Sequence, residues 1–67
     1  MMESIGTIKF RDHETNRGGV AIVRASRQVV AVALSLEIDG DIEVFLAPED
    51  VRRLSEVLAK ALAVAKQ

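Results

Sequence analysis

The stretch RQVVAVALSLEIDGDIEVFLAPED, from Arg27 to Asp50, decides the fold. Two runs rich in Val, Ile and Leu flank an Asp-Gly pair, and the second run ends shortly before Pro48. Runs of this composition on either side of a turn signal predict two strands joined as a hairpin. Proline favours the first position of a helix, so we expect a helix to begin at Pro48.

The first of these runs is apolar on both sides. Val30, Val32 and Leu34 share one face of an extended strand, and small or β-branched residues occupy the alternate positions. A strand with one solvated face alternates apolar with polar residues instead. The pattern therefore predicts that both faces of this strand are covered, although one helix in so short a chain covers only one of them.

The same reasoning extends to the whole chain, which we expect to be a single domain, residues 1–67, of the α+β class. Period-two patterns predict four strands and a 3.6-residue pattern predicts one helix. We predict a four-stranded antiparallel β-meander with the C-terminal helix packed on one sheet face (ββββα), the strands lying at about 5–11, 20–24, 28–37 and 41–46, and the helix at about 48–65.

Register follows from matching apolar residues across each hairpin. A three-residue loop 38–40 pairs Leu36 with Ile42. A turn at Ser26-Arg27 pairs Val23 with Val30. The polar segment 12–19, DHETNRGG, reads as a flexible loop between the first two strands.

The helix shows an apolar stripe that can pack on the sheet. Its members are Val51, Leu54, Leu58, Ala61, Leu62 and Ala65, and Val57 and Val64 widen it on one side. The later half of the helix carries a single charged residue, Lys60, which suits burial between a sheet and a second helix.

Composition points to assembly. The chain has 67 residues, no cysteine and one histidine, which excludes disulfides and a multi-histidine zinc site within one chain. A domain this small has a marginal core and usually needs a disulfide, a metal or a partner subunit. We therefore predict a homo-oligomer, most simply a dimer. Its expected interface residues are Val20, Ile22, Val29, Ala31, Ala33, Phe45, Val57 and Val64.

The chain shows no bias towards membranes. It contains no apolar run near the ~20 residues of a membrane span, and its start lacks the features of a signal peptide. The formal net charge is −1. We expect a cytoplasmic protein.

No group of residues predicts an active site, a cofactor or a metal. His13 lies in the polar loop and reads as a solvated side chain. A glycine pair at Gly18-Gly19 is followed by a strand, whereas a phosphate-binding loop precedes a helix. Glu37 and Glu43 could form an acid pair, but nothing else supports an enzyme. We expect a non-catalytic binding or interaction module.

An alternative function is binding of single-stranded nucleic acid along a basic strand edge. The residues that would contact it are Lys9, Arg11, Arg17, Arg24 and Arg27. The order of four strands followed by a helix is similar to the PC4-type transcriptional coactivators, and this resemblance implies a dimer that binds single-stranded DNA. Such binders add stacking aromatic residues, whereas this chain has only Phe10 and Phe45.

Overall fold

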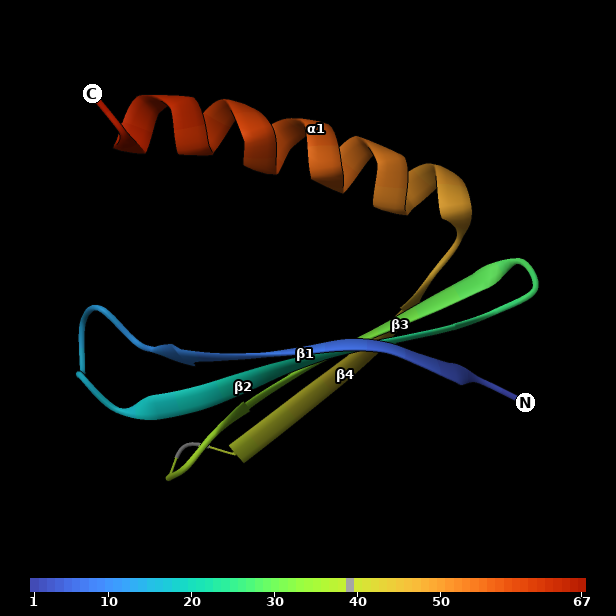
Figure 1. Cartoon of the computed structure of the whole chain (residues 1–67), viewed down its shortest axis with the longest axis horizontal. Helices are drawn as coiled ribbons and strands as arrows, with labels where there is room; N and C mark the ends of the chain where they lie inside the picture. Colours follow the sequence, from blue (N-terminus) through green and yellow to red (C-terminus); the bar gives the residue numbers. More distant parts are fainter. Residues whose placement is uncertain (39) are drawn as a thin grey trace.

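The computed structural model of the chain, which describes residues 1–38 and 40–67, confirms the predicted fold. Four strands form one antiparallel sheet in the order β1-β2-β3-β4, and one helix follows (Figure 1). The elements are β1 (Glu3–Arg11), β2 (Gly18–Ser26), β3 (Val29–Leu36), β4 (Gly40–Leu46) and α1 (Pro48–Ala65).

The second strand is longer than predicted. It begins at Gly18, which pairs with Arg11, so both glycines belong to the sheet rather than to the loop. The connecting loop covers 12–17 and is closed by backbone hydrogen bonds: the Asp12 N–H donates to the Arg17 carbonyl at 2.8 Å, and the Asn16 N–H donates to the Asp12 carbonyl at 2.8 Å. The prediction of a flexible loop up to residue 19 was wrong at this end.

Both predicted registers were wrong by two residues. Val23 pairs with Val32 rather than Val30, and Ile42 pairs with Leu34 rather than Leu36. The turn between β2 and β3 consists of Arg27 and Gln28, not Ser26 and Arg27. A shift of two residues leaves every side chain on its predicted face, because the side-chain period of a strand is two.

The register divides the sheet into two faces that differ in side-chain size and charge. We call the first the large face; its members are Glu3, Ile8, Phe10, Ala21, Val23, Ala25, Val30, Val32, Leu34, Leu36, Ile42, Val44 and Leu46. We call the other the small face; its members are Thr7, Lys9, Arg11, Val20, Ile22, Arg24, Val29, Ala31, Ala33, Ser35, Asp41, Glu43 and Phe45. In β1 a bulge between Ser4 and Gly6 interrupts the alternation.

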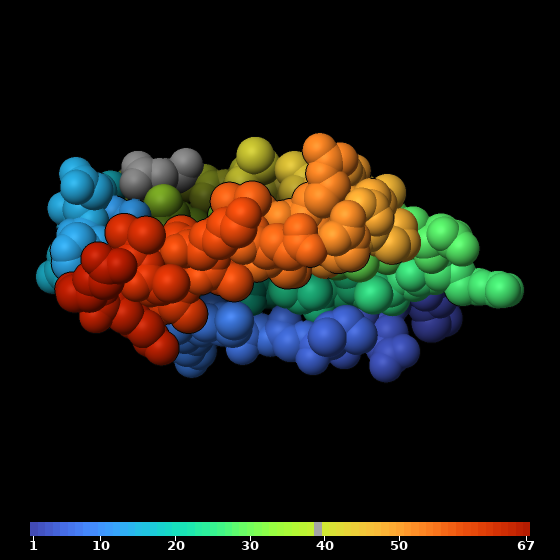
Figure 2. Space-filling view, turned by 90° about the horizontal axis from the view of Figure 1, so that it is seen from above, coloured from blue at the N-terminus to red at the C-terminus, as the bar shows by residue number. Residues whose placement is uncertain are grey.

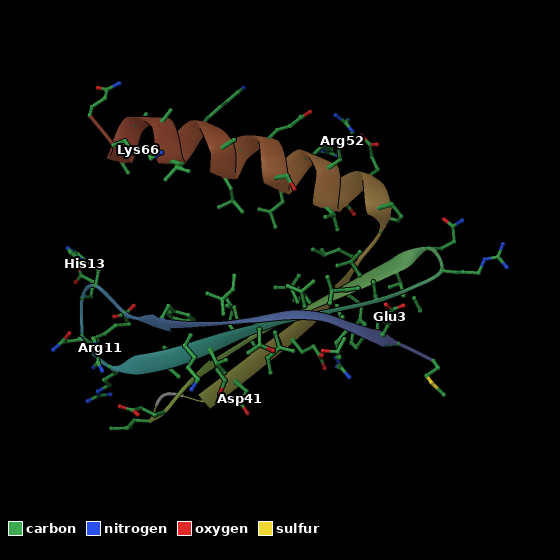
Figure 3. The ribbon with its side chains drawn as sticks, viewed as in Figure 1. Glu3, Arg11, His13, Asp41, Arg52 and Lys66 are labelled. Atoms are coloured by element: carbon green, nitrogen blue, oxygen red, sulfur yellow. The ribbon has the colours of Figure 1, made fainter. Side chains whose placement is uncertain are left out.

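The helix lies over the large face. Asp41, which belongs to the small face, points away from α1 in Figure 3. Seen from above in Figure 2, α1 runs lengthwise over the sheet and leaves β1 visible along one side. The packing is loose, since none of the helix residues, all of which are described, is buried.

Candidate functional site

The apolar stripe of α1 faces the large face of the sheet, yet both surfaces remain accessible to solvent. Leu58 and Leu62 on the helix are 59% and 55% exposed. On the sheet, Ile8 is 63% exposed and Ile42 is 61% exposed. A tightly packed helix and sheet would bury such side chains almost completely. These two facing surfaces therefore leave exposed many apolar side chains that close packing would bury.

Only one residue separates the sheet from the helix. β4 ends at Leu46, Ala47 is extended with φ −70° and ψ 154°, and Pro48 begins α1. A connection this short, followed by a residue with a fixed φ, sets the position of the first helical turn relative to β4. Val51, in that first turn, is the one half-buried residue of the helix.

The small face carries a cross-strand ion pair. Arg24 on β2 donates to the carboxylate of Glu43 on β4, so the pair spans the central strand β3. The register places Ala31 opposite Arg24 on one side and opposite Phe45 on the other. Among the described residues, Ala31 is the single buried hydrophobic one, with no exposed surface. Because Ala31 is small, the longer side chains of Arg24 and Phe45 have room beside it. They cover part of the small face, which the sequence pattern predicted to be covered.

Further polar groups lie towards the other end of the sheet. Ser35 donates from its hydroxyl to Asp41 Oδ1 at 2.6 Å, across β3 and β4. Lys9, Arg11 and Glu37 border an open depression that is also lined by Phe10, Gly18, Gly19, Val20 and Ser35. Two cations and one carboxylate line the depression, so its net charge is weakly positive.

The predicted interface residues do not form one surface. Val20, Ile22, Val29, Ala31 and Ala33 lie on the small face, together with the 60% exposed Phe45. Val57 and Val64 lie on α1, over the opposite face, and are 61% and 68% exposed. Their role in an interface stays a prediction. The exposure of the large face was not predicted from the sequence, because the helix was expected to cover that face completely.

The predicted nucleic-acid residues are also dispersed. Lys9 and Arg11 share the small face of β1, and Arg11 Nη1 donates to the Asn16 carbonyl at 2.6 Å. Arg24 is paired with Glu43. Arg17 lies in the loop 12–17, whereas Arg27 lies in the turn between β2 and β3, at the opposite end of the sheet. The structure therefore brings only two of the five together on a single strand.

The loop that contains His13 is organised by the preceding residue. Asp12 Oδ2 accepts hydrogen bonds from the Thr15 N–H and the Thr15 hydroxyl, both at 2.8 Å. These bonds favour the ionised carboxylate, and the backbone bond from Thr15 contributes most to lowering the pKa of Asp12 below its ordinary value. His13 itself is exposed. Within residues 1–38 and 40–67, no three potential metal ligands cluster together.

Comparison with known proteins gives no relative for this chain: no family model, no curated protein and no solved structure matches it. None of the described helices is long and apolar enough to cross a membrane.

Proposed function

We propose that the chain is a small, non-catalytic interaction module that works as a homo-oligomer. The main support for this proposal is the solvent-accessible surface area of the chain. A compact monomer of 7.3 kDa exposes about 4,200 Å². This chain exposes 5620 Å². The excess of about 1,400 Å² is close to what each subunit buries in an obligate dimer.

The dimensions of the fold support the same proposal. The radius of gyration is 13.3 Å, whereas a compact domain of this length has about 11 Å. In the described part of the chain, no large side chain is fully buried. Since the sequence contains no cysteine, a disulfide cannot compensate for so small a core. A partner subunit would supply the missing apolar contacts.

The mass of the purified chain in solution tests this proposal. We expect light scattering at micromolar concentration to give at least twice the 7.3 kDa of a single chain. A folded, stable monomer under these conditions would overturn the proposal. Circular dichroism on the same sample distinguishes a folded monomer from an unfolded chain, because only the former shows strand and helix signals.

A second candidate is binding of single-stranded nucleic acid through Lys9 and Arg11. Its support is that both cations project from the same face of the edge strand β1, beside the open depression. We expect such binding to weaken steeply as salt increases and to weaken further in Lys9→Ala and Arg11→Ala variants. Fluorescence anisotropy with a labelled single-stranded oligonucleotide measures it. An absence of binding at low salt would remove this candidate.

A further inference from the structure

We infer that a second copy of this chain docks on the apolar surface formed by the large face of the sheet and the inward side of α1. This inference rests on the proposed homo-oligomer and specifies which surface assembles. It differs from the sequence-based expectation, which placed the sheet part of the interface on the small face.

Charge separates the two faces of the sheet. Among the described residues of the large face, the one charged residue is Glu3, which lies at the start of β1 and pairs with Ala25. The small face carries Lys9, Arg11, Arg24, Asp41 and Glu43. Burying that many charges at a protein interface is costly unless each is paired, whereas interface cores are depleted in charge. The large face is therefore the better surface for a buried contact.

The same argument about charge excludes the outward side of α1 as the surface on which a second copy docks. Arg52 pairs with Glu49 and with Glu56, and the distance to Glu56 Oε2 is 2.7 Å. The side chains of the Arg52 pairs are more than half exposed and keep the outward side of the helix in water. The pair of Arg53 with Asp50, at 3.6 Å, lies instead at the beginning of the flank of the apolar stripe, since Asp50 precedes Leu54 by four residues and Val57 by seven. A partner must therefore approach from the apolar stripe or from its flank.

The flank of the stripe has a pattern that suits contact with an identical helix. Leu54, Val57, Ala61 and Val64 follow one another at intervals of three, four and three residues. This spacing repeats that of paired helices in coiled coils, and it is the same when read from either end. A two-fold axis brings identical surfaces together, so a self-complementary seam fits a second copy. Ala61 is small enough to let two helices approach closely.

The chain's own helix leaves this surface open. Leu34 and Val44 on the large face are 45% and 42% exposed, and Leu54 on the helix is 45% exposed. The connection through Ala47 and Pro48 sets where the helix begins. The excess of about 1,400 Å² calculated above is an amount that a second copy of the same size can cover.

Two positions on β4 provide a matched test. Ile42 on the large face and Phe45 on the small face are 61% and 60% exposed, so a charge at either position is equally compatible with the isolated chain. We expect Ile42→Lys to reduce the mass in light scattering to that of one chain, and Phe45→Lys to leave the assembly intact. Dissociation by Phe45→Lys with retention of the assembly in Ile42→Lys would overturn the inference.

Leu62→Lys and Ala63→Lys extend the test to the helix, because these neighbours point to different sides of α1. We expect the first to dissociate the assembly and the second to preserve it. If the wild-type chain is itself a monomer, the proposed function fails. If the wild-type chain is an oligomer that survives both Ile42→Lys and Leu62→Lys, only the present inference fails.

Thiol labelling keeps the inference testable if a lysine variant does not fold. The chain contains no cysteine, so Ile42→Cys and Phe45→Cys each introduce a single reactive thiol. We expect the thiol at position 42 to react at least about tenfold more slowly than the thiol at position 45 in the native protein, and equally fast in denaturant. Equal native rates, or faster labelling at position 42, would overturn the docking of a second copy on the large face.

Discussion

At the scale of single residues, the turn between β2 and β3 shows a local conflict between side chain and backbone. Gln28 has φ 69°, in the left-handed region that glycine adopts without steric cost. We expect Gln28→Gly to raise the free energy of unfolding by about 0.5–1 kcal/mol, since the relief of strain exceeds the entropy that glycine loses. Urea unfolding measures this change. The control Arg27→Gly, at the neighbouring position without a positive φ, should destabilise the protein instead.

A second residue-scale prediction concerns the turn at Asp12. Its pKa is lowered by the Thr15 N–H first and by the Thr15 hydroxyl second, so the ionised form is favoured in the folded state. The stabilisation is therefore present above the pKa of the unfolded chain and is lost as pH falls through the folded value. We expect Thr15→Val to raise the pKa of Asp12 while the backbone bond remains. Carbon-detected NMR titration of the carboxyl group measures this, and an unchanged midpoint would contradict it.

The sequence predicted the two faces of β3, but it did not predict which side chains cover the small face. The alternation of Val and Leu with Ala was sufficient to assign the faces. The ion pair between Arg24 and Glu43 was not predictable, because it depends on the register of three strands at once. A register that differs by two residues moves these partners apart while keeping the same faces. The exposure of Leu58 was equally hidden, since periodicity identifies an apolar stripe but not its distance from the sheet.

At the scale of elements, the beginning of α1 lacks a side-chain cap. Ala47 occupies the N-cap position without an acceptor, and Glu49 and Asp50 in the first turn compensate only by their charge. We expect Ala47→Ser to stabilise the protein by about 1 kcal/mol, because serine can accept a hydrogen bond from the first helical turn. Thermal unfolding followed by circular dichroism measures the gain. Ala47→Val is the control and should give no gain, since valine has no acceptor.

The element pattern was the most predictable part of the fold. The helix lies at 48–65, as predicted, because Pro48 marks its start and the apolar stripe marks its length. The strands were predicted in number and order, but β2 extends from 18 to 26 rather than from 20 to 24. Gly18 and Gly19 read as turn residues, whereas both belong to β2, and Gly19 allows Phe10 and Leu36 to lie close to its backbone.

At the scale of the whole molecule, folding and assembly should be a single equilibrium. A chain that exposes 5620 Å² and buries no large side chain fully within its described residues has little core of its own. If the second copy supplies the missing contacts, the unfolded state is monomeric and the folded state is not. Mass action then favours the folded state as the protein concentration rises.

We therefore expect the midpoint of thermal or urea unfolding to increase with the total concentration of the chain. For a two-state dimer, each tenfold increase in concentration adds about 1.4 kcal/mol to the stability per mole of dimer. Circular dichroism at several concentrations from low to high micromolar measures this shift. Ile42→Lys is the informative variant, because docking on the large face predicts that it removes the concentration dependence, whereas Phe45→Lys should retain it. A midpoint that is independent of concentration in the wild-type chain would mean that the loosely packed sheet and helix are stable without a partner.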